Sequence, residues 1–144
     1  MKNIKNRKAY FEYSILEEFE GGLCLEGAEV KSIRNGDVTI SDSFLFVKNS
    51  EIFVKNMKIA RYKNSHKLMK HDENRDKKVL LTRKEISKIE RMLDEKGTTM
   101  VCLGLFLKNN RIKIKLGVCK GKKLHDKRNA IKERDLEREI RNVR

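Results

Sequence analysis

The chain has 144 residues, about one domain, and a chain of this size buries roughly two thirds of its unfolded surface. Its 35 Lys and Arg against 21 Asp and Glu give a net charge of +14, which attracts polyanions such as RNA, DNA or an anionic membrane. No apolar run approaches the roughly 18 residues of a spanning helix, and the start MKNIKNRKAY lacks a signal-peptide core. We therefore expect a cytoplasmic protein without a membrane partner.

The N-terminal segment is basic. It contains no acid among its first eight residues and carries four cations, Lys2, Lys5, Arg7 and Lys8. This composition predicts an unstructured arm over residues 1–8. The strand-type residues between Tyr10 and Ile15 predict a strand, and the pair Gly21-Gly22 predicts a turn after it.

Residues 28–34 predict a short helix with Val30 and Ile33 on its inner face, ended by Asn35-Gly36. Alternating apolar residues between 38 and 54 then predict strands, with a hairpin turn at residues 48–50. For three aromatic residues we favour burial in the core over stacking on bases, because stacking platforms show clustered exposed rings. These residues are Phe44, Phe46 and Phe106.

Residues 61–78 carry many cations without a sustained period and predict a long exposed connection. The following segment, TRKEISKIERMLDEKG, predicts a helix with a capping box between Thr82 and Glu85 and a stop at Gly97. Its buried stripe is expected at Ile86, Ile89 and Leu93. A hairpin follows, with its tip at residues 109–110 and Ile112, Ile114 and Leu116 on one face.

Many short strands around one capped helix predict a mainly β fold with helices, a small closed or partly closed antiparallel barrel of the oligonucleotide-binding type. A two-layer α+β sandwich fits the pattern almost as well.

Catalytic chemistry is not indicated. The segment GVCKGKK resembles a phosphate-binding loop only superficially, because its glycines are too close and Lys123 replaces the hydroxyl residue that holds magnesium. A cluster of acids could be read as a metal-dependent nuclease site, but we interpret it as a solvated face: Glu17, Glu18, Glu20, Glu26 and Glu29. We expect no catalytic residue, no cofactor and no metal.

The three cysteines, Cys24, Cys102 and Cys119, form neither an even set nor a close pair. This spacing predicts reduced, buried thiols rather than a disulfide framework or a zinc site.

Five motifs occur in order along the chain: NRKA at 6–9, EEFEGGLCLEGAEVKSIRNG at 17–36, ISDSF at 40–44, LLTRKEI at 80–86 and KGKKLHDKRNAIKERD at 120–135. Together they closely resemble the SsrA-binding protein (SmpB) family. The resemblance implies an oligonucleotide-binding-type barrel with about three helices at residues 9–120, preceded by the arm at 1–8 and followed by a basic tail at 121–144.

The resemblance also implies a function. Family members bind tmRNA, an RNA that is part transfer RNA and part messenger, and rescue bacterial ribosomes stalled on messages without a stop codon. The barrel would bind the tRNA-like domain, and the tail would enter the decoding centre and message channel of the small subunit. An elongation factor would be an indirect partner through tmRNA. A basic ribosomal or RNA-chaperone protein without tmRNA preference remains the alternative.

Carried over by position, the resemblance implies an RNA-facing set in the arm and barrel: Asn6, Arg7, Lys8, Glu20, Leu80, Thr82 and Lys113. Leu80 could equally be core, and Thr82 could serve as a helix cap. The ribosome-acting motif of the tail would be Gly121, Lys122, Lys123, Asp126, Lys127 and Arg128.

The tail also has a helical period. At about 100° per residue, one basic side gathers Lys123, Lys127, Arg134, Arg138 and Arg141, while Leu136, Ile140 and Val143 lie opposite. A helix with so small an apolar stripe is marginal in water. We expect the tail to be disordered when free and helical when bound to RNA.

Overall fold

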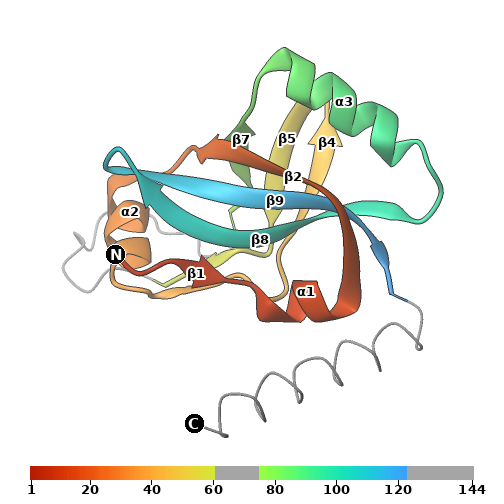
Figure 1. Ribbon diagram of the computed structural model, residues 1–144. Helices are drawn as coiled ribbons and strands as arrows, with labels where there is room; N and C mark the ends of the chain where they lie inside the picture. The colour runs from red at the N-terminus through yellow and green to blue at the C-terminus, as the bar shows by residue number, and fades with distance from the viewer. Residues whose placement is uncertain (61–74, 123–144) are drawn as a thin grey trace, which may run out of the picture.

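The computed structural model describes residues 1–60 and 75–122 (Figure 1). Within them the strands are β1 (Ile4–Lys5), β2 (Tyr13–Leu23), β3 (Val38–Thr39), β4 (Phe44–Lys48), β5 (Glu51–Lys55), β6 (Lys58–Ile59), β7 (Lys77–Leu80), β8 (Thr98–Lys108) and β9 (Arg111–Gly121). The helices are α1 (Arg7–Glu12), α2 (Gly27–Arg34) and α3 (Arg83–Leu93).

The strands close into a ring. The sheet runs β1-β8-β4-β5-β7-β2-β9, and β8 also pairs with β9, so that every strand of the ring has two antiparallel neighbours. The separate two-stranded sheet is β3-β6. Closure removes the exposed edges that an open sheet would leave. The predicted antiparallel barrel is confirmed, and the sandwich alternative is wrong.

The inside of the ring holds the main core. On β9, Ile112, Ile114 and Leu116 are buried, as their alternation predicts. Helix α3 lies over one end of the ring and contacts β8 and β9 (Figure 1). Ile89 of this helix is fully buried, and Ile86 and Leu93 pack partly buried against the same core. The predicted stripe of α3 is confirmed.

The ends of the helices and hairpins follow their local sequence signals. Helix α2 stops at Asn35, and Gly36 has a φ of +81°. Helix α3 starts at Thr82, whose hydroxyl accepts a hydrogen bond from the Glu85 amide. The two tight hairpins use residues with positive φ, which the primed turns require: Asn49 and Ser50, and Asn109 and Asn110. These predictions are confirmed. The stop predicted at Gly97 is wrong, because α3 ends at Leu93 with Asp94 as its C-cap, and Gly97, with a φ of +83°, lies in the turn before β8.

The predicted unstructured arm is wrong for residues 4–8. Ile4 and Lys5 pair with Leu105 and Gly104 of β8, and α1 begins at Arg7. Asn6 lies between these two elements and is buried, with its amide bonded to two distant carbonyls. The basic composition of the segment did not predict this structure, because β1 and the start of α1 are held by residues that are distant in the sequence. The strand expected from residue 10 begins only at Tyr13, after α1.

Gly21-Gly22 is not a turn but part of β2, which continues to Leu23. A Cβ on Gly21 would lie 2.8 Å from Val79 Cγ1 and 2.9 Å from the Leu80 carbonyl oxygen. Glycine is therefore needed for the close approach of β7 rather than for a change of direction.

The expected core positions of Phe44, Phe46 and Phe106 are also wrong. Phe44 is exposed, and Phe46 and Phe106 are only half-buried. On β4 it is Leu45 that enters the core, so the two phenylalanines of that strand point outward. The alternation predicted for β4 was displaced by one residue, and such a displacement exchanges the side chains that face the core with those that face outward.

The predicted connection at 61–78 ends earlier than expected, because Lys77 and Lys78 belong to β7. The buried Lys77 ammonium donates hydrogen bonds to the carbonyls of Met57 (3.1 Å) and Arg75 (2.6 Å). The remainder of that prediction, at 61–74, lies outside the described residues, as does the tail from 123 onward. No helix among the described residues is long and apolar enough to cross a membrane.

Candidate nucleic-acid interface

Strand alternation creates an outward surface across β7, β2, β9 and β8. Leu80 is the Cα partner of Gly22, Gly22 is the partner of Lys113, and Lys113 is the partner of Phe106. Four neighbouring strands thus place these residues in one row. We define the charged face as this row and the adjoining outward residues: Glu18, Glu20, Gly22, Leu80, Phe106, Lys113 and Lys115.

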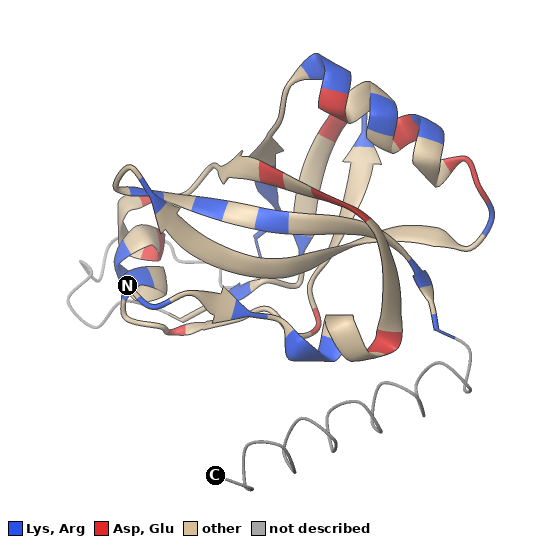
Figure 2. Cartoon of the chain, in the orientation of Figure 1, with Lys and Arg blue, Asp and Glu red and all other residues tan. Residues whose placement is uncertain are grey.

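Ion pairs join residues of the charged face to one another and to Lys108. Lys115 Nζ lies 3.2 Å from Glu18 Oε2, and Lys108 Nζ lies 3.7 Å from Glu20 Oε2. The hydrogen bond and the charge of Glu18 raise the pKa of Lys115, which therefore remains protonated. Figure 2 shows basic bands along β9 beside acidic bands along β2. Exposed pairs of this kind are weak and can be exchanged for contacts with phosphate.

A groove runs along the charged face beside β1. Its cavity volume is about 400 Å³, and its lining includes Lys5, Tyr10, Glu20, Phe106 and Lys115. Lys5 Nζ lies 4.9 Å from the centroid of the Tyr10 ring. Burial, followed by the charge of Glu18, raises the pKa of Tyr10, so its hydroxyl stays protonated and can donate a hydrogen bond.

The sequence-based set did not include Lys5, Tyr10, Phe106 or Lys115 from this groove. Lys115 could have been predicted from the sequence, because it lies two residues after Lys113 and both alternate with buried residues of β9. No sequence signal indicates Tyr10, because this residue reaches the groove through α1, a helix that the local sequence pattern does not predict.

Of the predicted residues in the arm, Asn6 is part of the fold. Its Nδ2 donates to the carbonyls of Cys102 (2.7 Å) and Ile40 (3.2 Å), and its Oδ1 accepts from the Ala9 amide (3.2 Å). Both donors of the amide are therefore used within the chain.

Arg7 and Lys8 are exposed on the first turn of α1. Lys8 Nζ contacts Asp42 Oδ1 at 2.9 Å. This hydrogen bond raises the pKa of Lys8 and lowers the pKa of Asp42. Lys8 lies in a different hollow from the groove, one that it shares with Asp42, Phe44 and Thr99.

Leu80 and Thr82 occupy different environments. Leu80 is 52% exposed, so the core alternative is wrong and its side chain is available for apolar contact. Thr82 caps α3 in a reciprocal capping box: its hydroxyl accepts from the Glu85 amide at 3.2 Å, and the Glu85 carboxylate accepts from the Thr82 amide at 3.0 Å. The structure thus brings Glu20, Leu80 and Lys113 together on the charged face and gives Thr82 a role in the helix.

The chemistry of this surface is binding. Two lysines, two carboxylates and an exposed leucine lie together on rigid strands, an arrangement that suits phosphates, hydroxyl groups and a base or ribose edge. Within residues 1–60 and 75–122, no group of three His, Cys, Asp or Glu side chains is placed to hold a metal ion.

A sequence model of the family described as "SmpB protein" matches residues 3–144. The chain belongs to the SmpB family. Three relatives described as SsrA-binding protein support the assignment. The protein of Treponema denticola is 46% identical and covers 94% of this chain and 88% of its own. The Mycoplasma mycoides protein is 41% identical, and the match covers 98% of this chain and 96% of that protein. The Persephonella marina protein is 47% identical, and the match covers 94% of this chain and 88% of that protein.

A solved structure of the SmpB family also matches the fold. It is described as "tmRNA-SmpB: a journey to the center of the bacterial ribosome" and has a TM-score of 0.71 at 34% identity. The match covers 86% of this chain and 87% of that chain. The predicted family and fold class are therefore confirmed by two independent comparisons.

Only the beginning of the predicted SmpB-type tail motif falls within the described residues. Gly121 pairs with Tyr13 at the end of β9, and the Lys122 amide donates to the Glu12 carbonyl at 2.9 Å. The tail therefore leaves the barrel beside α1. The other predicted tail residues lie outside the described residues: Lys123, Asp126, Lys127, Arg128, Arg134, Arg138 and Arg141.

Proposed function

We propose that this chain binds tmRNA and acts as an RNA-binding adaptor in trans-translation, rescuing ribosomes stalled on non-stop messages. The observation that carries the proposal is the family match over residues 3–144, which includes the whole barrel. The solved relative, described as tmRNA-SmpB on the bacterial ribosome, supports both tmRNA and the ribosome as partners. We place this activity in the cytoplasm and assign no catalytic step to the chain.

The charged face would bind the tRNA-like domain. Lys113 would contact phosphates, together with Lys115 once its pair with Glu18 is exchanged. Glu20 would accept hydrogen bonds from ribose hydroxyls or base amino groups, and Leu80 would contact a base or ribose edge. This combination reads the shape of a structured RNA rather than its sequence, because phosphate contacts carry no sequence information.

Residues in α1 would extend this contact. Arg7 is exposed, and Lys8 is held only by its exposed pair with Asp42. Arg7 would contribute a phosphate contact at the start of α1, and Lys8 would contribute one at the separate hollow that it shares with Asp42. Asn6 would act indirectly, by fixing the start of α1 against the β8 backbone.

Equilibrium binding to tmRNA tests the proposal. At a stated salt concentration, we expect the chain to bind tmRNA more tightly than an unrelated RNA duplex of similar length. Equal affinities for the two RNAs would contradict the proposal and favour a basic ribosomal or RNA-chaperone protein. Co-purification with ribosomes from cells that lack tmRNA would favour the same alternative.

We propose a separate role for the tail. Residues 121–144 would enter the vacant decoding centre and message channel, become helical there and contact ribosomal RNA through their basic side. The elongation factor would be reached through tmRNA. The period of Lys123, Lys127, Arg134, Arg138 and Arg141 supports this role, since it gathers their charges on one side of a helix.

Truncation after Lys122 separates the two roles. It retains the strand pairing of Gly121 and the Lys122–Glu12 hydrogen bond. We expect tmRNA binding to survive and peptide tagging on stalled ribosomes to be lost. Loss of both would show that the tail belongs to the primary tmRNA contact.

A further inference from the structure

A cluster of aromatic rings lies outside the core on β4 and β5. Phe46 and Phe53 are cross-strand partners, with ring centroids 5.7 Å apart and an interplanar angle of 24°. Phe44, two residues before Phe46, is 40% exposed. The core side of the same hairpin is already filled by Leu45 and the residues around it, so these rings form a separate outward cluster.

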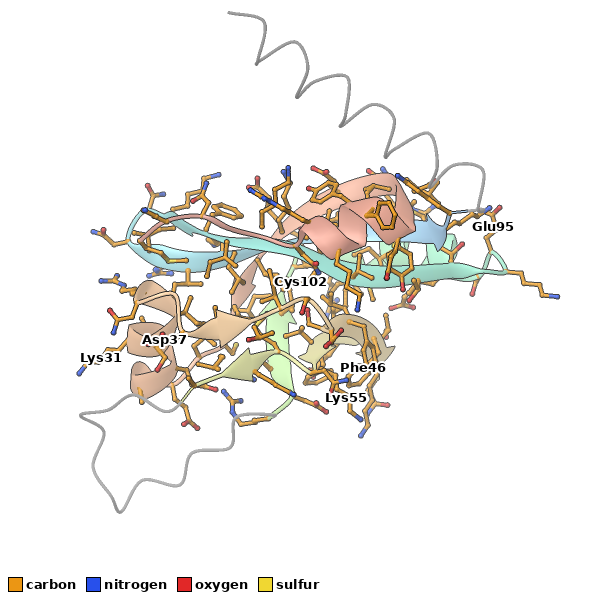
Figure 3. The ribbon with its side chains drawn as sticks, turned by 90° about the horizontal axis from the view of Figure 1, so that it is seen from below. Lys31, Asp37, Phe46, Lys55, Glu95 and Cys102 are labelled. Atoms are coloured by element: carbon orange, nitrogen blue, oxygen red, sulfur yellow. The ribbon has the colours of Figure 1, made fainter. Side chains whose placement is uncertain are left out.

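Cations surround the rings. Lys55 is the Cα partner of Phe44, and Lys78 is the partner of Phe53. We define the aromatic face by Phe44, Phe46, Lys48, Phe53, Lys55 and Lys78. Figure 3 shows Phe46 and Lys55 together on the β4 and β5 side of the molecule. This side lies away from the layer of β8 and β9.

The charges of the aromatic face are unbalanced. Its neighbouring acid, Glu51, pairs with Lys78 at 3.2 Å. For Lys48 and Lys55 no ion pair is found with any residue in 1–60 or 75–122. The face therefore combines exposed ring surface with excess positive charge. An apolar segment of a partner protein would contact only the rings. A nucleotide would contact the rings with its base and the lysines with its phosphate.

The aromatic face ends in a hollow of the size of a nucleoside. Phe44 lines a cavity of about 310 Å³ together with Lys8, Tyr13, Asp42 and Thr99. Hydroxyl, carboxylate and ammonium groups in this wall offer hydrogen bonds to a base edge or ribose. Pockets that bind small ligands have volumes from about 300 Å³ upward.

We propose that the aromatic face is a second RNA-binding surface, which takes up unpaired nucleotides of a single-stranded segment. One base stacks on the outward rings of Phe44, Phe46 and Phe53, of which Phe44 is exposed and the other two are half-buried, and the phosphates beside it contact Lys48 and Lys55. The proposal rests on the proposed function only in taking the chain to be an RNA-binding protein. It adds a surface for single strands to the charged face, which suits structured RNA.

The two surfaces meet on β7. Lys78 belongs to the aromatic face and Leu80, two residues later, to the charged face. A structured RNA bound to the charged face could therefore continue as a single strand across β7 onto β5 and β4.

The test is binding of a fluorescent eight-nucleotide single-stranded RNA to the full chain. Phe46→Leu and Phe53→Leu retain apolar bulk but remove the ring, and together they are expected to weaken binding by about fivefold or more. Phe11→Leu is the matched control, because it removes a half-buried ring from α1, outside both faces. Lys55→Gln is likewise compared with Lys96→Gln, the same charge change at another exposed site.

Aromatic NMR signals of the wild-type chain make the test independent of variant folding. Addition of the oligonucleotide should shift the ring signals of Phe46 and Phe53 more than that of Phe11. The inference is overturned if the oligonucleotide does not bind, if ring removal leaves its affinity unchanged, or if Phe11→Leu has the same effect. Preference for tmRNA over duplex, measured in parallel, reports on the proposed function separately.

Discussion

The cysteines lie in two kinds of environment. Cys102 and Cys119 are buried, and Cys24 is exposed on the described part of the chain. Burial raises the pKa of Cys102 to about 12 and the pKa of Cys119 to about 11. Because the thiolate is the reactive form, burial protects Cys102 and Cys119, whereas Cys24 is accessible to reagents. The prediction of buried thiols is confirmed for Cys102 and Cys119 and wrong for Cys24.

Thiol labelling checks this difference. At pH 8 an alkylating reagent should modify Cys24 in the folded chain and leave Cys102 and Cys119 unmodified, as peptide mass spectrometry would show. In denaturant all three should react. Modification of Cys102 in the folded chain at a rate close to that of Cys24 would contradict the burial described here.

The same burial predicts a loss of stability in alkali. The neutral Cys102 thiol is favoured in the folded state, because its pKa lies above the ordinary value of 9.0. Its contribution is thus fully present below about pH 9 and decreases as pH rises toward 12. In denaturant titrations, the free energy of unfolding of Cys102→Ala should fall less steeply over this range than that of the wild type. Equal slopes would contradict the prediction.

Two roles of Thr82 can be distinguished by mutation: capping of α3 and direct contact with RNA. Thr82→Ala should lower the free energy of unfolding by about 1 kcal/mol, because the Glu85 amide loses its partner, and Thr82→Ser should largely restore it. Denaturant unfolding measures the effect. If Thr82→Ala weakens tmRNA binding without changing stability, the residue contacts RNA directly.

At the scale of elements, the attachment of β1 to β8 orders the N-terminal segment. The two strands approach so closely that a Cβ on Gly104 would lie 2.5 Å from the Ile4 carbonyl oxygen. This attachment positions α1, and with it Tyr10 and Lys5 of the groove. The N-terminal part of the candidate interface therefore depends on one glycine of a neighbouring strand.

Replacement of this glycine should separate β1 from the barrel. Gly104→Ala should lower the free energy of unfolding by about 1–3 kcal/mol, because the obstructing atom belongs to the backbone and cannot rotate away. Hydrogen exchange at the Asn6 amide, which donates to the Leu103 carbonyl at 2.8 Å, should also become faster. Gly27→Ala is the control, since a Cβ there meets nothing within 4 Å. Similar losses of stability in both variants would contradict the role of close approach.

The elements that could be predicted from the sequence are those whose signals are local. The N-cap of α3, the end of α2 and both hairpin turns depend on residues within a few positions of one another. The elements that could not be predicted depend on distant partners. Asn6 bonds to carbonyls 34 and 96 positions away, and the phase of β4 is set by the strands beside it.

The candidate site divides in the same way. Glu20 and Leu80 were identified in motifs of the family and Lys113 by its position in the last hairpin, and the structure places the three on neighbouring strands. Tyr10 and Phe106 were not identified, because their positions follow from the unpredicted α1 and from the pairing register of β8 with β9.

For the whole molecule, closure of the ring makes the charged face rigid. Each strand of this face has a hydrogen-bonded neighbour on both sides, so the spacing of its lysines is set by the strand register. The net charge of +14 draws any RNA toward the chain, but it is this spacing that can favour one RNA shape over another. Affinity and preference therefore have different physical origins in this protein.

The most direct test of the central claim is the salt dependence of tmRNA binding by Lys113→Gln, with Lys96→Gln as the control. If the charged face binds tmRNA, loss of one phosphate contact should weaken binding and reduce the slope of log K against log salt by about one, and the control should resemble the wild type. Identical affinities and slopes for Lys113→Gln and the wild type would contradict the claim that tmRNA lies on the charged face.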